Sequence, residues 1–158
     1  MLPRALAIDF GTKRVGLAVS DSLGIAATPI AVLEGLSPDR VADEVARIAK
    51  DRGVGILVVG LPMNMDGTEH KSAADVRRRA EMCSRRAGLA VDWVDERLTT
   101  VQAERHLREA GFARQGRRDR VDRVAAALIL QSWLALKRAP IPGRPSGSVR
   151  DSEGDESE

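Results

Sequence analysis

The sequence has little cysteine and histidine, with one cysteine and two histidines in 158 residues. A lone cysteine, Cys83, excludes a disulfide framework within the chain. Two histidines are too few for the usual closed zinc sites, which combine cysteine and histidine ligands. His70 falls in a predicted loop and His106 lies among polar residues, so we expect both to be solvated rather than catalytic.

Aromatic residues are also scarce, at 3% of the chain, while hydrophobic residues make up 43%. A chain of this length can bury a core in one domain, and that core should be aliphatic. No apolar run approaches the roughly 20 residues of a membrane helix, and the N-terminus lacks the pattern of a secretory signal peptide. We therefore expect a globular protein of the cytoplasm that does not contact a membrane.

The net charge of +2 is unevenly distributed along the chain. Residues 139–158 contain two arginines and five acidic residues, so they carry a net charge of −3 and leave +5 on the rest. The same stretch is rich in proline and glycine, a composition that buries too little apolar area to offset chain entropy. The sequence predicts one domain over residues 1–138 and a disordered tail over residues 139–158.

The chain begins with three predicted strands, which cover Ala5–Asp9, Val15–Ser20 and a short stretch around Ile30–Leu33. The short connections between them favour an antiparallel meander. A helix should follow, because Ser37 is a favourable N-cap and Pro38 suits the first helical position.

Strands and helices alternate in the rest of the chain. Ile56–Val59 is wholly apolar, which is typical of a buried parallel strand. The later elements are a helix from Ser72 to Ala87, a strand Ala90–Val94, a helix from Thr99 or Thr100 to about Gly111, and a helix from about Arg120 to Lys137. Such alternation gives right-handed crossovers between parallel strands. We predict an α/β fold with a mixed five-stranded sheet, three antiparallel strands and then two parallel ones, flanked by helices.

Acidic residues stand at the ends of three of these elements. Asp9 ends the first strand, Glu96 follows the strand Ala90–Val94, and Asp122 begins the last helix. Ligands of parallel sheets collect at the carboxyl ends of strands, where Asp9 and Glu96 lie. Three carboxylates repel one another unless a cation bridges them, and oxygen ligands favour Mg²⁺ or Mn²⁺. Two such ions can hydrolyse a phosphodiester, so the three acids are candidate metal ligands and catalytic residues of a nuclease.

Each acid also has an ordinary structural interpretation. Asp9 can cap the turn that follows it, and Glu96 can pair with Arg97 at the entry of a helix. Asp122 can be a first-turn acid that the helix dipole favours. The metal site is favoured because two of the acids share the carboxyl edge of the sheet and the third heads a helix that should pack on it.

Basic residues lie close to these acids in the sequence. Contacts from Lys and Arg to phosphate give affinity for nucleic acid without sequence preference. The candidates for phosphate contacts are Lys13, Arg14, Arg97, Arg117, Arg118 and Arg120. The arginines of the second predicted helix, Arg77–Arg79 with Arg85 and Arg86, are explained slightly better by a solvated helix face.

Four segments together resemble the YqgF family of bacterial RNase H-like proteins. They are Ala7–Gly16, Val59–Glu69, Asp95–Thr100 and Val121–Leu130, which occur in the family's order and spacing. The resemblance covers Leu6 to Leu136, and the proline-rich acidic tail lies outside the family pattern. Members of this family are described as Holliday junction resolvases and as pre-16S rRNA nucleases.

The resemblance implies an RNase H-like fold and Mg²⁺-dependent hydrolysis of phosphodiester bonds. It implies that Asp9, Glu96 and Asp122 form the acidic triad. Residues that it places around the site are Gly11, Thr12, Asn64, Asp66 and Thr99. Asp119 is a candidate fourth acid without a firm match in the family pattern.

Three functions are consistent with these residues. The first is a nuclease that trims the 5′ end of precursor 16S rRNA during ribosome assembly, with nucleic acid and ribosomal particles as partners. The second is the same chemistry on four-way DNA junctions, for which a homodimer rather than a monomer is expected because two strands are cut symmetrically. The third is a non-catalytic nucleic-acid-binding factor, which the intact triad disfavours. RNA and DNA are both held mainly through phosphates, so these residues fit either.

The predicted tail allows a test by truncation. Deletion from Pro140 onward should leave the melting temperature nearly unchanged, because the segment has no apolar face to bury. Calorimetric melting of the full and truncated chains measures this. A clear fall in melting temperature on truncation would show that the tail packs on the domain.

Overall fold

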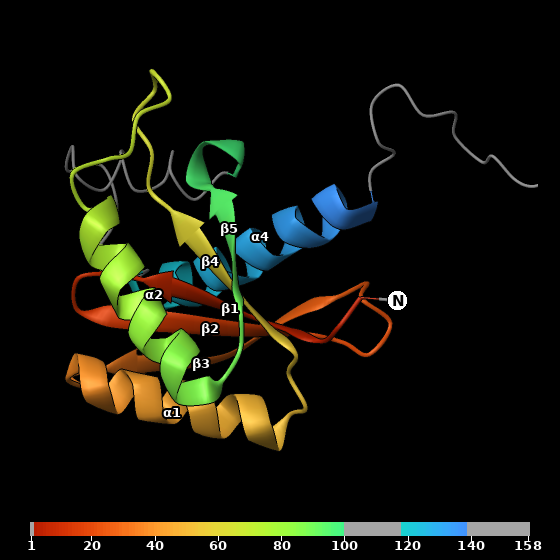
Figure 1. The fold of residues 1–158 in the computed structure, drawn as a ribbon. Coiled ribbons are helices and arrows are strands. Elements are labelled where there is room, and N and C mark those ends of the chain that lie inside the picture. Colours follow the sequence, from red (N-terminus) through yellow and green to blue (C-terminus); the bar gives the residue numbers. More distant parts are fainter. Residues whose placement is uncertain (1, 100–117, 139–158) are drawn as a thin grey trace, which may run out of the picture.

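The computed structural model describes the backbone of residues 2–99 and 118–138 and the side chains of residues 2–99 and 125–138. The elements are β1 (Ala5–Phe10), β2 (Arg14–Ser20), β3 (Ala27–Glu34), α1 (Pro38–Asp51), β4 (Ile56–Leu61), α2 (Ala73–Ala87), β5 (Val91–Asp95), the short 3₁₀ turn η1 (Glu96–Leu98) and α4 (Arg118–Arg138) (Figure 1). The helix predicted from Thr99 or Thr100 to about Gly111 lies outside the described residues.

The strands form one mixed sheet in the order β3-β2-β1-β4-β5. β2 is antiparallel to both β1 and β3, whereas β4 is parallel to β1 and β5 is parallel to β4. The predicted α/β fold with three antiparallel and two parallel strands is therefore confirmed. Because β1, β4 and β5 run in the same direction, their carboxyl ends lie at one edge of the sheet (Figure 1).

The edge strand β3 is longer than the predicted stretch Ile30–Leu33. It includes Pro29, which opposes Ala18 of β2. Proline is tolerated at a sheet edge or beside a bulge because no ladder hydrogen bond is needed from its nitrogen. The pairing of β2 with β3 does shift register between Leu17 and Ala18, which marks such an irregularity.

The two faces of the sheet bury side chains of different size. The face toward α1 and α2 is built by larger residues, among them Leu6, Ile8, Leu17, Leu57 and Val59. The face toward α4 is built by Ala5, Ala7, Ala18, Val58 and Val94, together with Ile129, Leu130 and Leu134 of the helix. Small strand residues let the long helix lie close to the sheet. The core is mainly aliphatic, as the composition predicts.

The ends of the two covering helices follow their sequence signals. The side chain of Ser37 accepts a hydrogen bond of 3.2 Å from the backbone nitrogen of Arg40, so Ser37 caps α1 as predicted. α2 ends at Gly88, whose φ of 69° is left-handed and suits glycine. No helix in the described part of the chain could span a membrane.

The arginines exposed on α2 are engaged in ion pairs with acids. Arg77 pairs with Glu69 at 2.6 Å and Arg78 pairs with Asp75 at 2.5 Å. The remaining pairs are Arg85 with Glu81, and Arg86 with both Asp39 and Asp43 of α1. Paired arginines of this kind support the interpretation of α2 as an ordinary solvated surface.

A polar clamp fixes α4 to the edge strand β5. The indole nitrogen of Trp133 donates a 2.8 Å hydrogen bond to a carboxylate oxygen of Asp92, and the Lys137 ammonium lies 3.1 Å from the same oxygen. Lys137 also lies over the Trp133 ring, 5.7 Å from its centre. The Trp133 hydrogen bond, followed by Lys137, lowers the pKa of Asp92 below its ordinary value.

This clamp predicts a pH-dependent share of stability. A carboxyl group with a lowered folded pKa stabilises the fold above its unfolded pKa of about 4, and the stabilisation is lost as pH falls through the folded pKa. The variant Asp92→Asn should therefore lose about 0.5–1.5 kcal/mol of unfolding free energy at pH 7, a small effect because the carboxylate is partly exposed. The difference from the native chain should shrink as the pH falls below about 4.

Urea unfolding at pH 7, 5, 4 and 3 measures both effects. Asp51→Asn, which removes an exposed acid at the end of α1, is the matched control. A difference between the native chain and Asp92→Asn that stays constant across these pH values would contradict the role of the ionised carboxylate.

Candidate active site at the carboxyl edge of the sheet

Asp9 is a buried carboxylate in the middle of the sheet, with 2% of its surface exposed. Alternation along β1 places it on the same face as Ala5 and Ala7, which is the face that α4 covers. Its partner on β2 is Gly16. On the other side the pairing of Ile8 with Val59 makes Gly60 the next residue of β4. Glycines on both neighbouring strands leave space around this carboxylate.

Glu96 is the second buried acid, with 3% of its surface exposed. It begins η1, directly after β5, and its backbone carbonyl accepts hydrogen bonds of 3.1 and 3.0 Å from the nitrogen and the hydroxyl of Thr99. Thr99, a predicted lining residue, thus fixes the backbone of the candidate acid. Burial of a carboxylate at this position has no explanation in core packing alone.

Gly60 leaves room for the Glu96 side chain above β4. A Cβ atom on Gly60 would lie 2.9 Å from a carboxylate oxygen of Glu96 and 2.7 Å from the terminal methyl of Ile129 on α4. The Glu96 carboxylate therefore lies over the backbone of β4, beside the position of Asp9 on β1. Asp9 and Glu96 therefore both lie on the face of the sheet that α4 covers.

The third predicted acid, Asp122, lies on α4, seven residues before Ile129. Seven residues are about two helical turns, so the two positions fall on the same side of the helix. Among the described side chains, no three His, Cys, Asp or Glu residues form a group that could hold a metal. The side chains of Asp122, Asp119, Arg118 and Arg120 are not among these, and Arg117 lies outside the described residues.

The turn between β1 and β2 carries further predicted residues. The nitrogen of Gly11 donates a 2.9 Å hydrogen bond to the carbonyl of Arg14, and a Cβ on Gly11 would lie 2.6 Å from that oxygen. Only glycine therefore fits this close turn. Thr12 and Lys13 are exposed at its tip. Arg14 is partly buried and lies 3.3 Å from the carboxylate of Glu34, so its charge is used within the sheet.

Arg97 supports the loop around Glu96. Its guanidinium makes two close contacts with Asp95, of 2.7 and 3.0 Å, and holds the pKa of that carboxyl below its ordinary value. The Arg97 side chain thus pairs with the residue before Glu96, Asp95, and the structural alternative for Glu96 stays a prediction. Arg97 also donates to the backbone carbonyl of Met65 at 3.3 Å. A phosphate bound by Arg97 would have to share it with these partners.

Two predicted lining residues stabilise the loop after β4. The amide of Asn64 donates to the hydroxyl of Thr68 at 2.9 Å and to the carbonyl of Glu69 at 3.2 Å. Asp66 accepts from the nitrogen and the hydroxyl of Thr68, at 2.9 and 2.7 Å. These hydrogen bonds lie within the loop itself. Asn64 and Asp66 therefore shape the rim of the site.

Arg79 supports the turn after β1, although the sequence pattern groups it with the solvated arginines of α2. It lies on α2 with 17% of its side chain exposed, donates to the carbonyl of Gly11 at 3.0 Å, and lies over the ring of Phe10. It therefore holds the turn after Asp9 from the other side of the sheet. The sequence does contain a sign of this inward position, because Arg79 falls at helical spacing between Val76 and Cys83, which are both buried.

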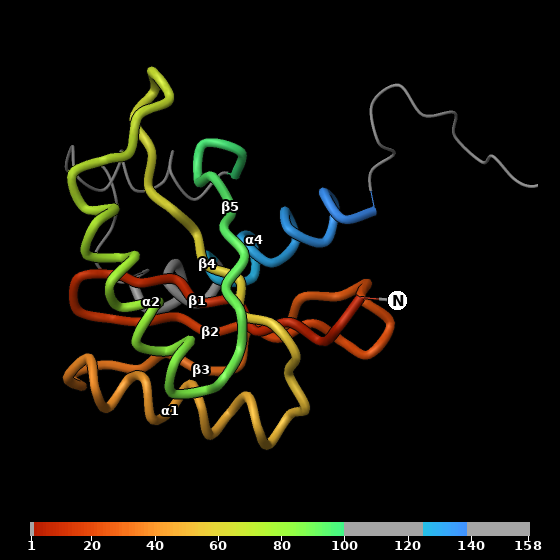
Figure 2. Tube along the Cα trace, in the orientation of Figure 1, coloured from red at the N-terminus to blue at the C-terminus, as the bar shows by residue number. Residues whose placement is uncertain are grey.

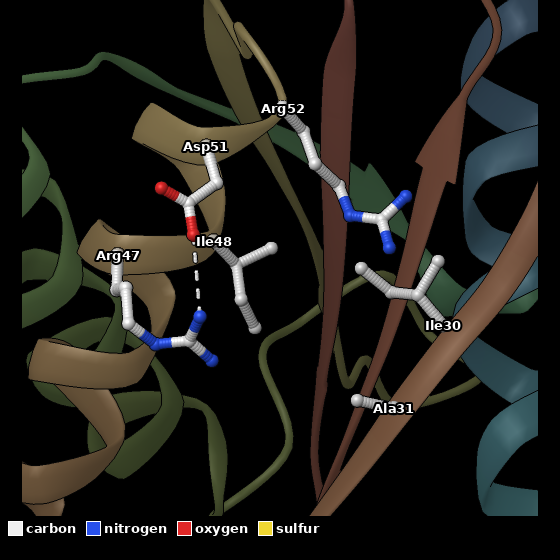
Figure 3. A pocket seen from close by; sticks show the side chains of 6 residues that line it. All are labelled: Ile30, Ala31, Arg47, Ile48, Asp51 and Arg52. Atoms are coloured by element: carbon white, nitrogen blue, oxygen red, sulfur yellow. Dashed lines mark hydrogen bonds and ion pairs between the residues drawn. The ribbon is translucent and has the colours of Figure 1, made fainter.

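A hollow elsewhere on the molecule lies between β3 and the end of α1 (Figure 3). It has a volume of about 450 Å³ and is lined by Ile30, Ala31, Arg47, Ile48, Asp51 and Arg52. Arg47 pairs there with Asp51 at 3.3 Å. None of the predicted site residues lines this hollow.

Cys83 is not suited to thiol chemistry, because burial raises the pKa of its thiol to about 11.

The sheet order and the helical layers define an RNase H-like α/β fold, and two buried acids, Asp9 and Glu96, lie at its carboxyl edge. The chain belongs to the RuvX family, described as Holliday junction resolvase, whose family profile matches residues 3–136. The resemblance to the YqgF family is thereby confirmed.

Curated relatives align with this chain over almost their whole length. A protein of Endomicrobium trichonymphae is 45% identical over 135 residues, which cover 85% of this chain and 96% of the relative. A protein of Anaeromyxobacter sp. is 44% identical over 136 residues, which cover 86% of this chain and 99% of the relative. Both carry the name "Putative pre-16S rRNA nuclease".

Solved structures agree with the fold. Thermus thermophilus RuvC in complex with a Holliday junction substrate aligns with a TM-score of 0.56 at 15% identity, covering 86% of this chain and 96% of that chain. A second structure of the same RuvC aligns with a TM-score of 0.52. At this identity the likeness shows the RNase H-like fold alone.

Gly60 provides a test of the site's geometry. Gly60→Ala should cost about 1–3 kcal/mol of unfolding free energy through overpacking, and it should displace the Glu96 carboxylate. Adding Ile129→Val removes the terminal methyl and should recover much of the stability. It leaves the contact with Glu96 in place, so the double variant should still bind Mn²⁺ more weakly than the native chain.

Chemical denaturation and calorimetric titration with Mn²⁺ separate the two effects. Ile129→Val alone is the matched control, and it should bind Mn²⁺ as the native chain does. If the double variant recovered both stability and Mn²⁺ binding, Gly60 would matter only for packing against α4.

Proposed function

We propose that this protein is a metal-dependent nuclease that hydrolyses phosphodiester bonds in the 5′ region of precursor 16S rRNA. The observation that carries the proposal is the burial of two acids, Asp9 and Glu96, at the carboxyl edge of the sheet, with the Glu96 carboxylate over the backbone of Gly60. The names of the curated relatives support precursor 16S rRNA as the substrate. Such a substrate fits a cytoplasmic location and association with ribosomal particles.

The donor set fits hard divalent cations. Asp9 and Glu96 offer oxygen atoms only, and Asp122 of α4 is the proposed third ligand. A divalent cation held by such oxygen ligands would offset the charge of these carboxylates. When bound, Mg²⁺ or Mn²⁺ supplies the charge that activates a water molecule and stabilises the leaving oxygen.

The chain's own residues position the substrate and the acids. Asp9 is fixed by the sheet, and Glu96 is fixed by the backbone bonds of Thr99 and by its contact with β4. Lys13 is exposed at the neighbouring turn and is the described cation best placed to contact a phosphate. Arg117, Arg118 and Arg120 remain predicted phosphate contacts beside Asp122.

Four-way DNA junctions are the second candidate substrate. The description of the RuvX family as Holliday junction resolvase favours it. The chemistry at the acids would be the same, because RNA and DNA present the same phosphodiester to the metal site. Symmetric cleavage of a junction would require a homodimer, whereas trimming of a single RNA end would not.

The variant Asp9→Asn tests the catalytic role. It removes one ligand charge but no phosphate contact, so cleavage should fall by more than about 100-fold while nucleic-acid binding stays within about twofold. The assay uses the purified protein with Mg²⁺, a precursor 16S rRNA fragment and a synthetic four-way junction. Binding is measured in the presence of EDTA.

Asp51→Asn, which changes an acid far from this edge of the sheet, should cleave as the native chain does. Full activity of Asp9→Asn would remove Asp9 from the mechanism. Cleavage of the junction without cleavage of the RNA fragment would favour the second candidate substrate. Activity that persists in EDTA would contradict a metal-dependent reaction.

A further inference from the structure

The loop after β4 forms a narrow hairpin over residues 62–70 that projects beyond the carboxyl edge of the sheet (Figure 1). Met63 and Glu69 are bridged as in an antiparallel pair. The nitrogen of Asn64 donates to the carbonyl of Thr68 at 2.7 Å, and Gly67, with a φ of 93°, closes the tip. With the side-chain bonds of Asn64 and Asp66, this network makes the hairpin stiff without a core of its own.

The hairpin is tied to the loop that carries Glu96. Arg97 is anchored by Asp95 and donates to the carbonyl of Met65 at the hairpin tip. Asp95 and Arg97 are the two neighbours of Glu96 in the chain, so the tip is fixed relative to the candidate acid. Figure 2 shows the hairpin and the turn after β5 rising on the same side of the molecule.

The tip presents apolar side chains although its polar groups bond inward. Met65 has 78% of its surface exposed and Leu98, the residue after Arg97, has 63% exposed. Single exposed apolar residues are common on protein surfaces. These two differ because the hydrogen bond from Arg97 to the Met65 carbonyl links their loops and Leu98 is two residues from Glu96. A flexible methionine also adapts to varied apolar partners.

We infer that Met65 and Leu98 form an apolar wedge, which contacts the faces of unstacked bases next to the scissile phosphate. The inference rests on the proposed function, since it assigns the wedge to the same nucleic-acid substrate. A phosphodiester that reaches Asp9 and Glu96 carries its flanking bases past the rim of the site. Apolar side chains, methionine and leucine among them, insert between base steps in other nucleic-acid complexes.

The chemistry of the tip favours bases over phosphates as its ligand. Asn64, Asp66 and Thr68 bond to one another or to the hairpin backbone, and Arg97 is held by Asp95. The tip therefore offers a thioether and a leucine side chain where a phosphate-binding loop would offer cations or free nitrogens. Such a wedge should prefer single-stranded or branched substrates, whose bases are already unstacked, over continuous duplex.

The test replaces the apolar side chains with glutamine, which keeps the length of methionine but is polar. Met65→Gln and Leu98→Gln are made in the Asp9→Asn background so that no substrate is cleaved. The probe is an RNA stem with an unpaired strand that carries 2-aminopurine at each unpaired position in turn. The matched control, Leu23→Gln, changes a residue 71% exposed in the loop between β2 and β3, at the opposite end of the sheet.

With both native wedge residues, binding should raise 2-aminopurine fluorescence at one or two positions. In the Met65→Gln, Leu98→Gln variant this rise should disappear and affinity for the unpaired substrate should fall on the order of tenfold. Affinity for continuous duplex and the salt dependence of binding should be unchanged, because no phosphate contact is removed. Leu23→Gln should behave as the native residue in all four measurements.

Failure of the inference and failure of the proposed function are distinguishable. Unchanged fluorescence and affinity in the double glutamine variant would overturn the wedge, even if the native chain cleaves RNA, and would leave a protein partner as the ligand of the tip. Loss of base unstacking in that variant would support the wedge, even if the native chain proved unable to cleave any substrate.

Discussion

The confinement of two acidic side chains between the sheet and α4 is the constraint on which the rest of this structure depends. Asp9 and Glu96 are each almost fully buried, and burial of a carboxyl group is costly unless other groups bond to it. Their positions are held by elements that cannot relax easily. β1 and β4 are the inner strands at this edge, and Gly60 and Ile129 define the space above them. Rigid placement of this kind holds both acidic side chains at fixed positions on this edge.

The two helical layers support this edge in different ways. On one face, small residues of the strands let α4 approach, and the clamp of Trp133 and Lys137 on Asp92 fixes the helix against β5. On the other face, Arg79 of α2 reaches the turn after Asp9. The acids therefore depend on both layers, although they lie in only one of them. Changes far from the acids can alter the site through either support.

Most of the fold and the two described acids could be predicted because they follow local rules. Apolar alternation, capping residues and glycine stops are written in contiguous residues, and an acid at a strand end is visible in the sequence. The partners of those acids could not be predicted, since they depend on register and side-chain reach. Gly60 lies under Glu96 only because β4 pairs in parallel between β1 and β5. Likewise, the contact of Arg97 with Asp95 depends on η1, which turns the chain after β5.

The same two strands supply both the buried and the exposed parts of the candidate site. β5 leads into Glu96, which turns inward over β4, and one residue later Arg97 turns outward to hold Met65. β4 likewise ends beneath the acid and continues into the projecting hairpin. Buried carboxylates need a dry, fixed setting, whereas recognition of bases needs an accessible rim. Because adjacent residues of one loop face both ways, a nucleic acid held at the rim, as we propose, would reach the acids without any movement of the sheet.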